Sequence, residues 1–280
     1  MIDNPLIEEA TVILTKAKRI LFLTSAGMSA DSNIPTFRDK EGYWNNFPPF
    51  KEKKLEAQDL ASPWAFRNEL PHAWAFYEWR RRNADENKPH DGYAVINQWI
   101  KNQFEEAFLH TTNTDGYHLR SGVPADKVKE VHGSMWRLQC LDVCSLKYWE
   151  EDSVPLCELD YETMKASKLP LCQNCRGIAR PHILMFGDSE YTGHSEQESQ
   201  FAEFLREPID TAVLVGSSGA VPTNDYIAYS LQKRGTKVIN INPDPSSNRV
   251  FRPDCYLPLG SEQAFVALDN KLENLGSKIL

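Results

Sequence analysis

The sequence predicts an α/β protein with a Rossmann-like, doubly wound parallel sheet, to which a small cysteine-rich lobe and a helical insert are attached. Short apolar runs of strand length recur along the chain, and segments with helical spacing of apolar residues separate several of them. Alternating strands and helices favour a parallel sheet that is covered on both faces. Two stretches break the alternation, and they predict the insert and the lobe.

The predicted strands and helices follow from the spacing of apolar residues. Buried strands are predicted at residues 19–24, 107–111, 128–131, 182–186, 212–216 and 237–241. Helices are predicted at residues 5–18, 93–104 and 195–206. On this basis the sheet domain comprises residues 1–42, 90–135 and 180–280. Residues 43–89, rich in Trp, Arg and Glu, form the helical insert, and residues 136–179 form the small lobe.

Composition and charge limit the classes of function. With 280 residues and 41% hydrophobic content, the chain can build one large domain with a smaller one attached. A net charge of −8 argues against general binding to nucleic acid or to an anionic membrane, although it is compatible with a basic protein or peptide substrate. The first 16 residues do not resemble a secretory signal, and no apolar run reaches about 18 residues. We therefore expect a cytoplasmic protein with reduced thiols, of unknown oligomeric state.

Four cysteines form two close pairs, Cys140-x3-Cys144 and Cys172-x2-Cys175. Such pairs supply the four tetrahedral ligands that zinc prefers, and the polar lobe around them is too small to bury much core. The alternative is four unrelated cysteines, but this does not explain why two close pairs occur in one segment. Cys157 lies between the pairs but lacks a close partner. Because four thiolates leave no open coordination position, the predicted ion is structural.

The first motif that can carry chemistry is the turn Ser25-Ala26-Gly27 after the first predicted strand, where a helix should begin near Met28. Small residues let the backbone approach a pyrophosphate, and a helix N-terminus favours its negative charge. The alternative is that the small residues only allow tight packing of the strand against the helix.

Polar residues also follow later strands. The segment 111–118 (TTNTDGYH) lies at the carboxyl end of a strand, where open α/β sheets bind ligands, although an Asn/Asp turn can also simply cap the next helix. His132-Gly133 follows another strand, and this histidine can act as a general base near neutral pH or be a structural residue. Residues 213–218 (VLVGSS) repeat the strand and small-residue turn, and residues 241–244 (INPD) can bind a ribose.

Taken in order, these motifs resemble those of the sirtuins, the NAD-dependent protein deacylases. The resemblance spans residues 18–259 and includes the segments SAGMS (25–29), NIPTFR (33–38), TNTDGYH (112–118), HG (132–133), the four cysteines, FGD (186–188), GSS (216–218) and IN (241–242). It implies one structural zinc ion and NAD as the cofactor. It also implies an acyl-lysine protein or peptide as the substrate.

Roles for individual residues follow from the resemblance. His132 is implied as the general base, Asn113 as the residue that orders water and the nicotinamide ribose, and Asp115 as the holder of the nicotinamide carboxamide. The residues implied around the cofactor are Ser25, Ala26, Gly27, Ser29, Asp31, Pro35, Phe37, Arg38, Thr112, Asn113, Asp115, Gly216, Ser217, Ser218, Asn242, Asp244 and Cys255. Phe186, Gly187 and Val221 are implied at the edges that pair with the substrate backbone.

The implied reaction is NAD-dependent removal of an acyl group from lysine, with release of nicotinamide and O-acyl-ADP-ribose. Several positions depart from the family pattern: Ser25 and Asn33 replace glycines, Asp188 replaces a glutamate, and Thr114 replaces an isoleucine. Thr112 also departs, and the altered pocket motivates an alternative, a sirtuin-type ADP-ribosyltransferase or NAD hydrolase. A non-catalytic NAD-binding module is a third hypothesis. The presence of His132 favours deacylation.

The helical insert carries Tyr77 and Arg80, which are one helical turn apart and can face one pocket. They resemble the Tyr-x-x-Arg pair of sirtuins that remove succinyl and malonyl groups. An arginine can bind a carboxylate through two hydrogen bonds, and the tyrosine adds a third. The alternative is that residues 80–82 (RRR) form a solvated face and that Tyr77 belongs to the core.

Overall fold

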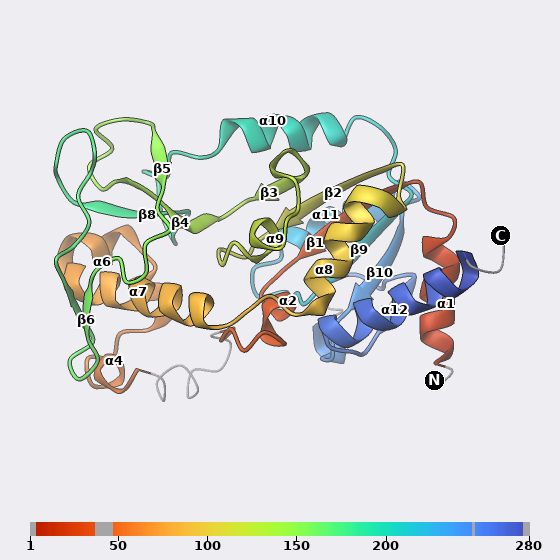
Figure 1. Ribbon diagram of the computed structural model, residues 1–280, viewed down its shortest axis with the longest axis horizontal. Coiled ribbons are helices and arrows are strands. Elements are labelled where there is room, and N and C mark those ends of the chain that lie inside the picture. The colour runs from red at the N-terminus through yellow and green to blue at the C-terminus, as the bar shows by residue number, and fades with distance from the viewer. Residues whose placement is uncertain (1–3, 37–46, 248–249, 277–280) are drawn as a thin grey trace.

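The computed structural model describes residues 4–36, 47–247 and 250–276, and its centre is a parallel sheet (Figure 1). The six strands lie in the order β11-β10-β9-β1-β2-β3. They are β1 (Arg19–Thr24), β2 (Glu106–Thr111), β3 (Val128–Glu130), β9 (Thr211–Val215), β10 (Lys237–Ile241) and β11 (Cys255–Leu257). The order reverses at β1, which pairs with β2 on one side and β9 on the other. A crevice for a ligand forms where the order reverses, at the carboxyl ends of these three strands.

The sheet is doubly wound, as predicted, because alternate residues of its strands pack into two separate cores. Ile20 and Phe22 of β1 belong to one core, and Leu21 and Leu23 belong to the other. The first core includes residues from α1 (Pro5–Leu14), α8 (Asp91–Gln98), the π-helical turn η1 (Trp99–Gln103) and α12 (Ser261–Gly276). The second includes residues from α10 (Ser195–Phe204) and α11 (Thr223–Gln232). Short turns of helix complete the connections: α2 (Gly27–Ala30), α9 (Tyr117–Arg120), η2 (Ala125–Lys127) and η3 (Pro245–Ser247).

A group of helices precedes α8 and extends to one side of the sheet (Figure 1). They are α4 (Pro48–Glu52), α5 (Ala57–Leu60), α6 (Pro63–Asn68) and α7 (Leu70–Glu86). The prolines begin helices here, because a proline in the first turn lacks only an N–H that has no helical partner. Ser62 caps α6 by accepting a hydrogen bond from the N–H of Ala65. No helix among the described residues is long and apolar enough to cross a membrane.

A second sheet is antiparallel and has the strand order β5-β4-β8. The four paired cysteines lie at the end of β4 and in the segments between the strands of this sheet. Its strands are β4 (Gly133–Cys140), β5 (Tyr148–Glu150) and β8 (Ala179–Ile183), and a small hairpin pairs β6 (Glu158–Asp160) with β7 (Lys165–Ser167). The prediction that residues 182–186 belong to the parallel sheet is therefore wrong. The sixth parallel strand is β11, which was not predicted. A short apolar run does not reveal whether its partner will be parallel or antiparallel.

Helix α7 holds the small lobe through one buried arginine, Arg81. Arg81 donates to the carbonyl oxygens of Met135, Glu151 and Ser153, and its guanidinium lies 4.6 Å from the centre of the Trp136 ring. Because Arg81 is fully buried, the alternative of a solvated arginine face is wrong for this residue. Burying a guanidinium is costly without hydrogen bonds, so these three bonds from its terminal nitrogens tie the carbonyls to α7.

Candidate active site

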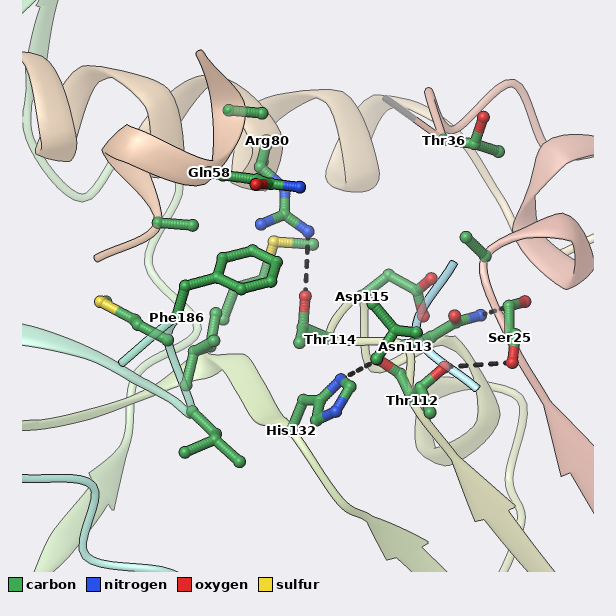
Figure 2. Close-up of a pocket in the computed structure, with 18 of the residues that line it drawn as sticks. Ser25, Thr36, Gln58, Arg80, Thr112, Asn113, Thr114, Asp115, His132 and Phe186 are labelled. Carbon is green, nitrogen blue, oxygen red and sulfur yellow. Dashed lines mark hydrogen bonds between the residues drawn. The ribbon is translucent and has the colours of Figure 1, made fainter. Parts of the chain in front are cut away.

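A cavity of about 980 Å³ lies at the carboxyl ends of β1, β2 and β9 and extends beneath α7 (Figure 2). It brings together most of the predicted site residues. Those that line it are Ser25, Ala26, Ser29, Pro35, Tyr77, Arg80, Thr112, Asn113, Asp115, His132, Phe186, Gly187, Gly216, Ser217, Ser218 and Val221. A mostly apolar cavity with a few converging polar groups is the usual form of a small-molecule site.

Ser29 is the centre of a buried hydrogen-bond network in the cavity floor. Its hydroxyl donates to Asp115 Oδ2 at 2.5 Å and accepts from Asn113 Nδ2 at 2.9 Å. Asn113 Nδ2 also lies 3.1 Å from the carbonyl oxygen of Ser25, and Tyr93 OH lies 3.0 Å from Ser29 Oγ. Burial raises the pKa of Asp115, while the hydrogen bond from Ser29 opposes that change. The network fixes the asparagine amide and the aspartate in one arrangement.

The small-residue turns after β1 and β9 pack directly against each other. A Cβ atom on Gly27 would lie 2.6 Å from Gly216 Cα, and Gly216 has a φ of +65°. Gly27 N–H donates to the Gly216 carbonyl oxygen at 3.0 Å. At Gly27, therefore, tight packing explains the need for glycine. Helix α2 has only four residues, so it contributes little macrodipole, and Ser25, Ala26 and Ser29 are the residues of this turn that face the cavity.

His132 is oriented as a neutral base. Its Nδ1 lies 3.1 Å from the carbonyl oxygen of Thr112, which can only accept, so Nδ1 carries the proton and Nε2 is left as an acceptor. Burial lowers the pKa of His132, and the bond to the Thr112 carbonyl partly offsets this. The N–H of Leu184 donates to the His132 carbonyl oxygen at 3.0 Å. The histidine is thereby tied to the segment that leads to Phe186.

The predicted substrate edges are both at the surface of the cavity. Phe186 is 51% exposed and Val221 is 48% exposed. Beneath Phe186 the chain turns at Gly187, which has a φ of +69°, and the buried carboxylate of Asp188 forms an ion pair with Arg180 at 2.8 Å. The N–H of Phe186 donates to the Ala61 carbonyl oxygen at 3.0 Å, so α5 and this edge are joined. Both edges are accessible to an extended peptide.

Several predicted cofactor residues do not line the cavity. These are Gly27, Asp31, Asn242, Asp244 and Cys255. Asp31 instead accepts hydrogen bonds from Ser261 and from the N–H of Glu262, at the start of α12. Cys255 is buried at the beginning of β11, whereas ligands in such sheets lie beyond strand ends. Phe37 and Arg38 lie outside the described residues. The cofactor roles of these seven residues stay predictions, as do those of the residues that line the cavity.

Other lining residues were not among the predicted site residues. They include Ile34, Thr36, Trp79, Asn83, Thr114, Met135, Ile183 and Met185. Asn83 follows Arg80 by three positions on α7, so helical spacing could have found it. Asn224 is fully buried beneath the first turn, where its Nδ2 lies 2.8 Å from the Thr24 carbonyl oxygen. Nothing local in the sequence marks Asn224, which is 200 residues from Thr24.

The four predicted cysteines meet at one point of the small lobe. Their sulfur atoms all lie within 4.8 Å of one another, and the Cys140–Cys175 and Cys144–Cys172 pairs are 3.6 Å apart. Tetrahedral zinc with bonds of about 2.3 Å requires sulfur atoms about 3.8 Å apart. The N–H groups of Asn174 and Gly177 point at the sulfurs of Cys172 and Cys175. The residues therefore fit one structural zinc ion, and Cys157 is not part of the group.

Comparison with known proteins identifies the class of protein that this fold and cavity define. The model of the Sir2 family matches residues 25–223. An NAD-dependent protein deacylase of Aquifex aeolicus (strain VF5) is 33% identical over 80% of this chain and 83% of its own. One from Pyrococcus furiosus is 32% identical over 85% of this chain and 87% of its own. The chain belongs to the Sir2 family.

Solved structures of the same family share the whole fold. A Sir2 homologue in complex with NAD has a TM-score of 0.78 at 25% identity and covers 96% of this chain and 94% of its own. A Sir2 homologue in complex with 2′-O-acetyl-ADP-ribose also has a TM-score of 0.78 at 25% identity. It covers 96% of this chain and 97% of its own.

Proposed function

We propose that the protein is an NAD-dependent protein-lysine deacylase, which releases nicotinamide and O-acyl-ADP-ribose. The observation that carries the proposal is the arrangement of Asn113, Asp115 and His132 around one cavity, in a chain of the Sir2 family. Bound NAD would supply the ribose that accepts the acyl group and the nicotinamide that leaves. A cytoplasmic location stays a proposal as well, supported by four cysteines that fit a metal site and not disulfides.

Different residues of the cavity have different roles in this reaction. Asp115 and the Asn113 amide, fixed through Ser29, present one carboxylate and one amide to the nicotinamide end of the cofactor. Such preorganised polar groups stabilise charge that develops during the reaction without having to reorient. His132 Nε2 is free to take a proton from a ribose hydroxyl, because Nδ1 is held by the Thr112 carbonyl. The peptide backbone would lie between Phe186 and Val221.

We extend the proposal to succinyl- and malonyl-lysine. The acyl end of the cavity is here the part lined by Tyr77 and Arg80 of α7, and these two residues favour an acidic acyl group. Tyr77 is fully buried and lines the cavity, and its hydroxyl has no hydrogen-bond partner among the described residues. Burial raises the pKa of Tyr77 to about 12, so the hydroxyl stays protonated and able to donate. Arg80 lies beside it, with its guanidinium 5.5 Å from the centre of the Tyr77 ring. A carboxylate in this position could accept a hydrogen bond from the Tyr77 hydroxyl and pair with the charge of Arg80.

A panel of peptides tests the reaction. Peptides of one sequence, carrying acetyl-, butyryl-, succinyl- or unmodified lysine, are incubated with NAD and the products are identified by mass spectrometry. We expect nicotinamide release that depends on the acyl group, together with free lysine and O-acyl-ADP-ribose. Labelled NAD distinguishes the alternatives, since label retained on protein indicates ADP-ribosyl transfer and free ADP-ribose without peptide indicates hydrolysis. Full nicotinamide release without any acyl-peptide contradicts the proposal.

Arg80→Met tests the acidic acyl group. Methionine keeps much of the apolar stem but removes the charge and the paired donors. We expect the ratio of kcat/KM for succinyl-peptide to kcat/KM for acetyl-peptide to fall at least about 30-fold, from the loss of charged hydrogen bonds. Arg120→Met is the matched control, because Arg120 is half-exposed, pairs with Asp85 and does not line the cavity. An unchanged ratio in Arg80→Met rules out the acidic-acyl assignment.

A further inference from the structure

Thr114 contacts Arg80, at the acyl end of the cavity, from the opposite side of the cavity. Arg80 Nη2 donates to Thr114 Oγ1 at 3.0 Å, and Figure 2 shows this bond crossing the cavity from α7 to the segment after β2. The reaction proposed above makes no use of a hydroxyl here. This hydrogen bond therefore needs its own explanation.

The Thr114 backbone is held in a fixed place. The residue is only 9% exposed, and its carbonyl oxygen accepts a hydrogen bond from the N–H of Met135 at 3.0 Å. Its neighbours Asn113 and Asp115 are each tied to Ser29. Because the backbone is fixed on both sides, the hydroxyl can serve as a rigid anchor for a long, flexible arginine.

The direction of the Arg80 donors matters because the Asp115 carboxylate and the carboxylate of an acidic acyl group would compete for the same positive charge. The guanidinium carbon lies 5.4 and 5.5 Å from the ring centres of Phe76 and Tyr77, and a contact with a ring face does not by itself set the direction of the N–H donors. The buried carboxylate of Asp115 attracts the guanidinium, as the mutual effects on the pKa of Arg80 and Asp115 indicate. A guanidinium drawn to Asp115 would present fewer donors to an acyl carboxylate.

We propose that Thr114 is a positioning residue that selects acidic acyl groups by holding the Arg80 guanidinium toward the acyl end of the cavity. The inference rests on the proposed role of Arg80 as the acyl-carboxylate ligand. It predicts that the Thr114 hydroxyl acts only through Arg80. Binding of a neutral acyl group should then be largely insensitive to it.

Thr114→Val is the direct test, since valine has nearly the same shape and lacks the hydroxyl. The ratio of kcat/KM for succinyl-peptide to that for butyryl-peptide is measured in the wild type, Thr114→Val, Thr114→Ser and Arg80→Met. We expect the ratio to fall about tenfold in Thr114→Val, mainly through KM for the succinyl-peptide. In Thr114→Ser, which keeps the hydroxyl, the ratio should stay within about threefold of the wild type. A double variant, Thr114→Val with Arg80→Met, should show no further loss beyond Arg80→Met.

The outcomes separate this inference from the proposed function. If Arg80→Met lowers the ratio and Thr114→Val does not, Arg80 binds the carboxylate without help and the inference fails alone. If Thr114→Val and Thr114→Ser lower the ratio equally, the hydroxyl is not the cause, which also overturns the inference. If Arg80→Met leaves the ratio unchanged, the assignment of Arg80 to an acidic acyl group fails and the role of Thr114 fails with it. Equal losses on both peptides in Thr114→Val show a general role near Asp115 and contradict a role in acyl selection.

Discussion

Replacing His132 by Asn is expected to lower kcat for deacylation by about 10³-fold. Asparagine can still donate to the Thr112 carbonyl oxygen, as Nδ1 of His132 does at 3.1 Å, but it cannot take a proton. Loss of a general base commonly costs about 10²–10⁴-fold in rate. Because the contact with Thr112 is kept, we expect the Kd for NAD, measured by calorimetry, to change less than about threefold. Single-turnover kinetics on an acyl-peptide give the rate.

His194→Asn is the matched control for loss of an imidazole. His194 is the N-cap of α10 and does not line the cavity, and asparagine can also cap a helix. The pH profile gives a second measurement of the same base. Burial lowers the pKa of His132 from its ordinary value of 6.5, so the neutral form dominates above pH 6.5. The rate should be level there and fall about tenfold per pH unit below the pKa. A fall that sets in above pH 7 contradicts this assignment.

Removal of the metal is expected to abolish activity together with the fold of the small lobe. The wild type should contain one zinc per chain, whereas Cys172→Ser should contain almost none and melt at a clearly lower temperature. Structural zinc sites contribute roughly 10–16 kcal/mol of apparent binding free energy to folding. Met135 and Ile183 line the cavity on β4 and β8, the strands that run into the lobe, so unfolding of the lobe would disturb part of the wall. Metal content by atomic emission and thermal melting provide the measurements.

Cys157→Ala is the control for the zinc site. Cys157 is also buried in the lobe, yet it lies outside the group of four sulfurs. We expect this variant to keep one zinc per chain. If Cys172→Ser kept both its zinc and its melting temperature, the four-cysteine assignment would be wrong. If Cys157→Ala lost the metal, Cys157 would have to replace one of the four ligands.

Much of the site could be predicted because its residues follow directly after recognisable strands. Ser25, Asn113 and His132 come at or just beyond the ends of β1, β2 and β3, and parallel strands bring their carboxyl ends to one edge. Asp31 and Cys255 are implied by the family resemblance but contact Ser261 and the Leu6 carbonyl oxygen, respectively, instead of lining the cavity, and their cofactor roles stay predictions. A motif gives the order of residues, but it does not tell which side chain of the motif turns toward the ligand.

The alternation of strands and helices, the four zinc ligands and the order of the family motifs could all be predicted from the sequence. These depend on local periodicity and short spacing, which report burial and geometry within one element. Packing of the folded chain, in contrast, places β8 in the antiparallel sheet and buries Arg81. It also brings Thr114 to Arg80, which is 34 residues away. Such contacts depend on which distant segments pack together, and a local sequence pattern does not predict this.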